Sequence, residues 1–216
     1  MTEPLLLDDF RREDGTSTLG TRWEGLTDRV MGGRSDMQVG HRDTDDGRVL
    51  YLRGQVRLEN RGGFIQARLP LCADGGSLDA SGWQGIRIKL RGRPGPYYLH
   101  LKTRQTWQPW QHFRAPVEVE AEWQERFVPF SAFEGRATWQ TLDPGGLKSI
   151  GVVAYGEAFL AEIEVARLER WPGSPRRGEG GGPGACGLLE DAGRRTDHAA
   201  RRKPRCSTKG SKSRSE

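Results

Sequence analysis

Two glycine-rich stretches hold the residue types best suited to binding an anion. One spans residues 28–35 and the other residues 54–64, and each contains a pair of adjacent glycines. Paired glycines admit positive φ and a close approach of the backbone, so the first pair and Ser35 can form a nest of amides around an anion. The glycines also fit a tight turn that directs Met31 and Phe64 inward. Because neither stretch contains a P-loop lysine, the nest and the turn both stay open as interpretations.

A second set of residues alternates aromatic rings with polar side chains. Its members, which we treat as candidate partner-binding residues, are Tyr98, His100, Lys102, Trp107, Trp110 and His112. On one face of a sheet, such rings can stack on sugars or peptide side chains while the polar tips form hydrogen bonds. The alternative is a solvated outer face, with Trp107 or Trp110 folded back over the core.

Residues for catalysis or metal binding are sparse. His100 and His112 are twelve residues apart and have no Cys or acidic partner at metal-ligand spacing. The serines lack a nucleophile-elbow context. The three cysteines are an odd number, which predicts neither a disulfide framework nor a CxxC metal knuckle. We therefore expect a protein that is not an enzyme and has no cofactor and no metal site.

The elements that position these residues are predicted to be strands. Apolar and polar residues alternate along much of the chain between residues 49 and 168, as in the run 86–91, where Ile, Ile and Leu are separated by Arg and Lys. Clusters of Gly, Pro and Asp punctuate these runs as turns. Many short strands at such spacing indicate an all-β sandwich or barrel. A single helical turn is expected within residues 128–133.

The chain divides after Trp171 in both charge and composition. The last 45 residues hold 11 Lys+Arg against 5 Asp+Glu, which leaves 23 against 24 in the first 171. All 7 Trp, 4 Tyr and 7 Phe lie at or before Trp171, so the remainder has little to bury. We predict one domain over residues 1–171 and a disordered, Gly/Arg/Pro-rich basic tail over residues 172–216. Since the tail lacks aromatic rings that stack on bases, no specific nucleic-acid partner is expected.

The same composition bears on the expected location of the protein. No apolar run approaches the roughly 18 to 20 residues that span a bilayer, so an integral membrane protein is not expected. The N-terminal segment carries Glu3, Asp8 and Asp9 where a signal or transit peptide would be basic. We expect a cytoplasmic protein.

The two glycine-rich stretches also carry a family resemblance. Residues 28–35, DRVMGGRS, are similar to the D-x-V-M-G-G-x-S signature of the complex I intermediate-associated protein 30 family. Residues 54–64, GQVRLENRGGF, resemble its F-x-G-x-V-S-x-E-N-N-G-G-F stretch, with Arg61 in place of the second Asn. The resemblance covers about residues 5–170. The matching positions are Trp23, Asp28, Val30, Met31, Gly32, Gly33, Ser35, Glu59, Asn60, Gly62, Gly63 and Phe64.

The resemblance implies a fold and a function. The fold would be a jelly-roll β-sandwich of the galactose-binding-like type, related in shape to carbohydrate-binding modules. The function would be that of a non-catalytic assembly or chaperone-like factor for NADH:ubiquinone oxidoreductase (complex I) or another membrane complex. Its partner would be a protein, either a subunit or an assembly intermediate. The alternative is a carbohydrate-binding module, whose ligand would be a glycan.

Overall fold

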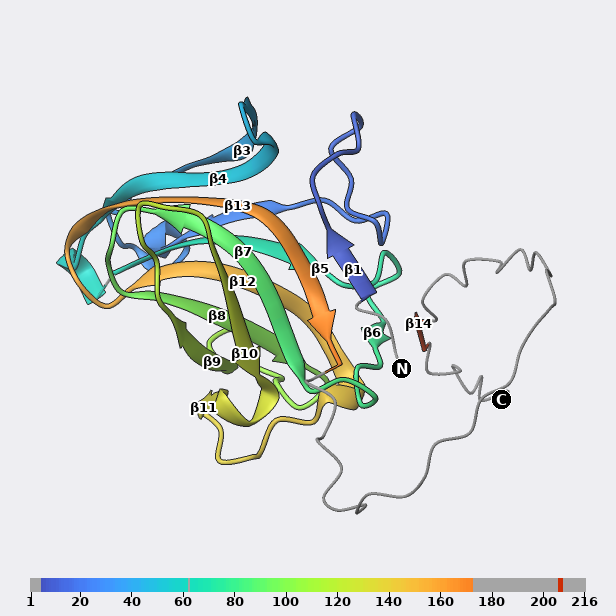
Figure 1. Ribbon diagram of the computed structural model, residues 1–216. Coiled ribbons are helices and arrows are strands. Elements are labelled where there is room, and N and C mark those ends of the chain that lie inside the picture. Colours follow the sequence, from blue (N-terminus) through green and yellow to red (C-terminus); the bar gives the residue numbers. More distant parts are fainter. Residues whose placement is uncertain (1–4, 62, 173–205, 208–216) are drawn as a thin grey trace, which may run out of the picture.

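Two antiparallel β-sheets pack face to face in the computed structural model, which describes residues 5–61, 63–172 and 206–207 (Figure 1). Sheet A has the strand order β10 (Gln124–Pro129), β7 (Gly85–Gly92), β13 (Phe159–Trp171), β4 (Gly47–Val56), β3 (Gln38–Thr44), and β1 (Leu5–Asp8) also pairs with β13. Sheet B has the order β11 (Glu134–Arg136), β9 (His112–Val117), β8 (Tyr97–Thr103), β12 (Leu147–Tyr155), β5 (Phe64–Pro70), β2 (Glu24–Thr27). The short strand β6 (Ser77–Leu78) pairs with β12 and with β14 (Cys206–Ser207).

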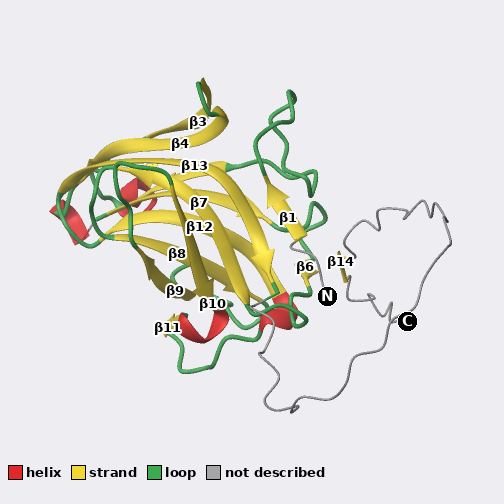
Figure 2. Cartoon of the chain, in the orientation of Figure 1, coloured by secondary structure: helices red, strands yellow, loops and turns green. Residues whose placement is uncertain are grey.

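Helical structure in the described residues is limited to short 3-10 turns (Figure 2). These turns are η1 (Asp28–Met31), η2 (Glu59–Arg61), η3 (Phe130–Ala132) and η4 (Pro144–Gly146). The turn expected within residues 128–133 is η3, which follows β10 directly. The prediction of an all-β sandwich is confirmed.

The core lies between the two sheets and is filled by alternate residues of each strand. On β7, Ile86, Ile88 and Leu90 are buried, while the Arg and Lys residues between them are partly exposed. On β8, Leu99 and Leu101 are buried in the same core. Because side chains on a strand point alternately to opposite faces, His100 between these two leucines lies on the outer face of sheet B.

The register of sheet B separates its connecting loops into two ends. Tyr155 of β12 pairs with Phe64 of β5, and Leu147 at the other end of β12 pairs with Thr103 of β8. The loop before β5 therefore lies at one end of the sandwich, and the loop after β8 lies at the opposite end. The second glycine pair and the Trp107–Trp110 loop are thus far apart.

The termini and cysteines bear on two further expectations. The predicted disordered tail, residues 172–216, falls outside the described residues apart from Pro172 and β14, so its prediction stays untested.

Cys72 is 3% exposed and disulfide-bonded. The odd cysteine count predicted no disulfide framework and gave no indication of this bond, because counting cysteines does not show which of them the fold brings together.

Candidate functional site

Histidine and tyrosine rings gather on the outer face of sheet B, where the alternation along β8 places them. The rings of His100 on β8 and His112 on β9 are stacked, with centroids 4.1 Å apart and an interplanar angle of 19°. Tyr98 lies on the same face, with its ring centroid 6.4 Å from that of His100. His100 is only 9% exposed, and its Nε2 atom has no hydrogen-bond partner in the described structure. The face therefore holds an unused polar atom among rings.

The environment of this histidine pair favours its neutral form. Burial lowers the pKa of His100 well below its ordinary value, and the charges of His112, Arg114 and Lys102 lower it further. Burial also lowers the pKa of His112, and its hydrogen bond to the Trp110 carbonyl only partly opposes this shift. Two neutral imidazoles can stack without charge repulsion, so the pair is a compact apolar patch with polar edges at neutral pH.

The outer face of sheet B also holds three residues that the sequence did not indicate for this site: Arg114, Tyr155 and Gln66. The guanidinium carbon of Arg114 on β9 lies 4.8 Å from the ring centroid of Tyr98 and 5.4 Å from that of Tyr155. The two tyrosine rings meet edge to face, with centroids 6.2 Å apart. Gln66 of β5 extends over Gly151, where any side chain would overlap it. A signal for Arg114 was present, because it follows His112 by two residues and so shares its face.

Lys102 and His112 hold the loop that follows β8. The Lys102 ammonium donates to the carbonyls of Gln108 (2.9 Å) and Pro109 (2.5 Å). Burial, with the nearby charges of Arg68 and Lys148, lowers the pKa of Lys102 to about 8. The His112 Nδ1 atom lies 2.9 Å from the Trp110 carbonyl oxygen. Both side chains therefore fix this loop.

The tryptophans of this loop are exposed. Trp107 is 82% exposed and Trp110 is 61% exposed. The interpretation in which one of them folds back over the core is therefore wrong, because hydrogen bonds from Lys102 and His112 hold the backbone of the loop in a conformation that leaves both rings in solvent. A third tryptophan, Trp139, is 99% exposed on the loop after β11. Sequence spacing gave no indication of Trp139, which belongs to a different connection.

The two tryptophan-bearing loops are joined at this end of the sandwich. The Gln111 side chain donates to the Ala137 carbonyl at 3.0 Å and accepts from the Trp107 amide at 2.9 Å. The Gln105 side chain donates to the Thr141 carbonyl at 3.0 Å. We call Trp107, Trp110 and Trp139 the tryptophan end. It presents large rings on loops that are ordered before any partner binds.

The first glycine-rich stretch is built around the buried carboxylate of Asp28. This carboxylate accepts hydrogen bonds from the Ser35 hydroxyl (2.6 Å), the Ser35 amide (3.0 Å) and the Gly63 amide (2.6 Å). Burial raises the pKa of Asp28, but these hydrogen bonds outweigh it and the net pKa is lowered. A side chain at Gly33 would overlap the Asp28 carboxyl. The amides of the nest therefore bind the chain's own anion.

The remaining signature residues stabilise this junction or lie on its surface. Gly32 has φ +86° and Gly63 has φ +127°, which explains glycine at both positions. The Asn60 side chain donates to the Gly32 carbonyl at 3.3 Å and so links the two stretches. Glu59 is exposed, and Gly62 lies outside the described residues.

The apolar signature residues do not point into the core as the turn interpretation requires. Met31 is 60% exposed, Val30 is 72% exposed, and Phe64 is only partly buried. Met31 lies in the short turn η1, whose hydrogen bonds to Asp28 hold it at the surface. Trp23 is partly buried against the core, and its indole N–H donates to the Asp8 carboxylate at 2.8 Å. Trp23 thus ties β1 to the sandwich.

The arrangement supports binding more than chemistry. Within the described residues, no group of three or more His, Cys, Asp or Glu side chains could hold a metal ion. Within the part of the chain that the structure describes, neither of the stacked histidines forms a hydrogen bond with a carboxylate. None of the helical turns in the described ranges has the length and apolarity needed to cross a membrane.

The two packed antiparallel sheets place the protein in the class of jelly-roll β-sandwiches. Within this class, the chain belongs to the Complex I intermediate-associated protein 30 (CIA30) family, whose model matches residues 9–159. This confirms the resemblance of the two glycine-rich stretches. No curated protein matches the sequence.

Solved structures with a similar fold include carbohydrate-binding modules. The family 11 module of the cellulosomal cellulase Lic26A-Cel5E of Clostridium thermocellum aligns with a TM-score of 0.65 at 15% identity, covering 82% of this chain and 99% of that one. The family 11 module from Clostridium thermocellum in complex with a β-1,3-1,4-mixed-linked tetrasaccharide aligns with a TM-score of 0.60 at 16% identity, covering 79% and 96%. An exo-β-agarase aligns with a TM-score of 0.53 at 10% identity, covering 79% of this chain and 25% of the agarase. At such identities the likeness shows the fold alone.

Proposed function

We propose that this protein is a non-catalytic protein-binding module that assists the assembly of a larger complex. Membership of the CIA30 family supports complex I, or another membrane complex, as the target. The observation that carries the proposal is the tryptophan end, where Trp107, Trp110 and Trp139 are 82%, 61% and 99% exposed. Large apolar rings that are exposed to water raise the free energy of the free protein, and a partner that buries them lowers it.

The tryptophan end has the properties of a protein interface. Trp is among the residues enriched in interface hot spots, where a few anchors account for most of the binding energy. The loops are held in place by the side chains of Lys102, Gln105, Gln111 and His112. Less conformational entropy is therefore lost when a partner orders around them. The partner we expect presents apolar pockets that accept these rings.

Glycan binding is the alternative function, and the exposed rings also favour it. Aromatic rings stack on the apolar faces of sugars, and the fold is shared with modules that bind polysaccharides. On the sheet face itself, however, Arg114 lies over both Tyr98 and Tyr155. Because the guanidinium lies against a face of each ring, less of their surface is open to a sugar chain. We therefore rank protein binding above glycan binding.

Affinity purification of the tagged full chain tests the proposal. The variant W107A/W110A/W139A removes the tryptophan end, and Phe127→Ala removes a ring that is 47% exposed on β10 of sheet A. The wild type and Phe127→Ala should recover the same subunits of a membrane complex, whereas the triple variant should lose them.

Two results would overturn this proposal. One is a triple variant that recovers the same subunits as the wild type. The other is a saturable calorimetric response to a mixed-linked β-glucan tetrasaccharide that disappears in the triple variant but persists in Phe127→Ala. The second result would establish glycan binding in place of protein binding.

A further inference from the structure

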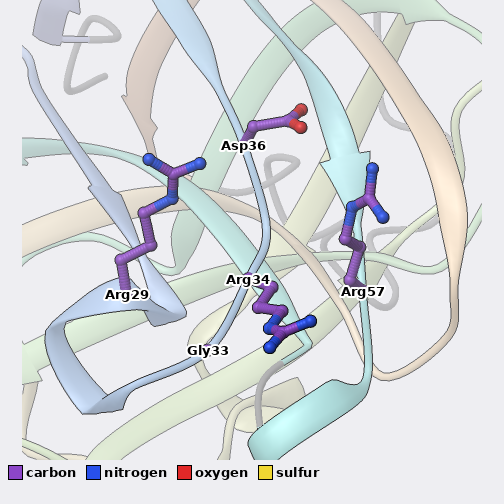
Figure 3. Close-up of a pocket in the computed structure, with 5 residues that line it drawn as sticks. All are labelled: Arg29, Gly33, Arg34, Asp36 and Arg57. Atoms are coloured by element: carbon purple, nitrogen blue, oxygen red, sulfur yellow. The ribbon is translucent and has the colours of Figure 1, made fainter.

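An arginine-lined pocket opens at the other end of the sandwich, beside the glycine-rich stretches. Its volume is about 440 Å³, and it is lined by Arg29, Gly33, Arg34, Asp36 and Arg57 (Figure 3). The lining therefore holds three guanidinium groups and one carboxylate. A volume of this size fits a small-molecule group rather than a single water or halide ion.

The arginines of this pocket have no carboxylate partner in the described structure. Twelve ion pairs join other residues of the described chain, and none includes Arg29, Arg34 or Arg57. Two carboxylates beside the pocket accept other hydrogen bonds. Asp36 accepts from the Gln55 amide at 3.2 Å, and Asp28 accepts from Ser35 and Gly63. Three guanidinium groups against the one carboxylate of Asp36 leave the lining of the pocket with a net positive charge.

Ser35 holds the walls of the pocket in place. The Arg29 Nε atom donates to the Ser35 carbonyl at 3.0 Å, and the Arg57 amide donates to the Ser35 hydroxyl oxygen at 2.9 Å. The same hydroxyl donates to the buried Asp28 carboxylate at 2.6 Å. One buried residue therefore fixes the spacing of two pocket arginines. Gly33 adds a wall without a side chain, which leaves the space between the arginines open.

We propose that this pocket binds a phosphate group that carries at least two negative charges. Planar guanidinium groups bind phosphate oxygens through paired, charge-assisted hydrogen bonds, and several arginines around one cavity suit a polyanion better than a single carboxylate. The phosphate can belong to a soluble molecule or to a lipid headgroup. Val30, Met31 and Leu58, next to the arginines in the chain, are 72%, 60% and 49% exposed, which is compatible with the lipid source.

The test uses the full chain and two matched double variants. Arg34→Gln with Arg57→Gln removes two pocket charges, and Arg53→Gln with Arg93→Gln removes two exposed charges that do not line the pocket. Calorimetry with inorganic pyrophosphate at constant ionic strength probes the soluble source. Sedimentation with phosphatidylcholine vesicles, with and without phosphatidic acid, whose phosphomonoester headgroup can carry two negative charges, probes the lipid source. All four side chains are exposed, so both variants should keep the wild-type unfolding midpoint.

The pocket variant should bind about tenfold more weakly, or worse, in at least one arm, while the control variant should match the wild type. Loss of pyrophosphate binding would assign a soluble phosphate, and loss confined to the vesicles that contain phosphatidic acid would assign a headgroup. Failure of the wild type to bind in either arm would overturn the proposal, as would equal weakening in both variants. Because the tryptophan end lies at the opposite end of sheet B, this result is independent of the partner-binding test.

Discussion

The outer faces of the two sheets differ in how their charged side chains are paired. On sheet A, Glu164 is 5% exposed and lies between Arg42 and Arg91, and Glu169 is 1% exposed and accepts from Arg87 at 2.7 Å. Arg167 also pairs with Glu169. Each buried carboxylate thus has two guanidinium partners.

The outer face of sheet B carries stacked rings in place of buried ion pairs, and the ion pairs on its described strands, Arg68 with Glu24 and Arg136 with Glu134, are exposed to solvent. Arg114 lies over two tyrosine rings and has no ion pair in the described residues, and the Nε2 atom of His100 has no hydrogen-bond partner. A surface whose charges are mutually satisfied gains little from a partner, whereas unpaired groups and exposed rings can gain hydrogen bonds and burial. The contrast suggests that the outer face of sheet A stabilises the fold through its buried ion pairs, and that sheet B, with its loops, provides the binding surface.

The largest effect is expected from breaking the pairing on sheet A. Glu169→Ala should leave Arg87 and Arg167 without their carboxylate and lower the free energy of unfolding by about 2 kcal/mol, since the arginines are only partly buried. Urea denaturation measures this loss. Glu120→Ala is the control, because Glu120 pairs with Arg126 but is 59% exposed, and it should cost about 0.5 kcal/mol or less. Equal losses in the two variants would show that the buried ion pairs stabilise the fold no more than an exposed pair does.

The two faces should also lose stability in different pH ranges. Burial, with the charges of His112, Arg114 and Lys102, lowers the pKa of His100. The unfolded chain therefore binds this proton more readily than the folded protein. The contribution of His100 to the free energy of unfolding is fully present above the ordinary pKa of 6.5 and is lost as the pH falls below it. Burial raises the pKa of Glu164, but the hydrogen bonds and charges of Arg91 and Arg42 lower it by more, so the net pKa is below its ordinary value of 4.5. Its contribution is therefore present above 4.5 and lost below that.

Thermal unfolding between pH 8 and pH 3 separates these two contributions. His100→Phe should flatten the loss in the higher range while leaving the lower range unchanged, and Glu164→Gln should do the reverse. His41 on β3 also has a pKa lowered by burial, so the comparison is between variant and wild type at each pH. His112 in the stack also has a pKa lowered by burial, so a His100→Phe variant that leaves the higher range as steep as before would show that His100 does not carry this dependence.

The strands of both faces were predictable from sequence, but the contents of the binding surface were only partly so. The alternation on β7 and β8 is local, and burial of one set of side chains follows directly from it. The exposure of Trp107 depends on anchors such as Lys102 and Gln111, which no spacing reveals. Tyr155 and Trp139 come from connections and strands distant in the chain. Only pairing of the strands brings them beside the predicted residues.

The glycine-rich stretches show the same limit. Their motif predicted a turn or an anion nest, and it identified Asp28 and Gly63 as signature positions. It did not show that the Asp28 carboxylate itself fills the nest, because the hydrogen bond to the Gly63 amide spans 35 residues of sequence. Two of the three pocket arginines, Arg29 and Arg57, are likewise brought together by Ser35 through contacts that the motif does not encode.

The smallest effect on stability is expected at the tryptophan end, and this expectation separates a binding surface from a packed one. Rings that are 61% to 99% exposed remove little apolar area from water on folding, so W107A/W110A/W139A should shift the free energy of unfolding by about 0.5 kcal/mol or less for each site. Trp83→Ala is the matched control, because Trp83 packs against the core and under Arg170, and it should cost about 2 kcal/mol or more. Urea denaturation compares the two variants. A triple variant that loses as much stability as Trp83→Ala would mean that the rings support the sandwich, and the partner surface would then have to lie on the sheet face around Arg114 and His100.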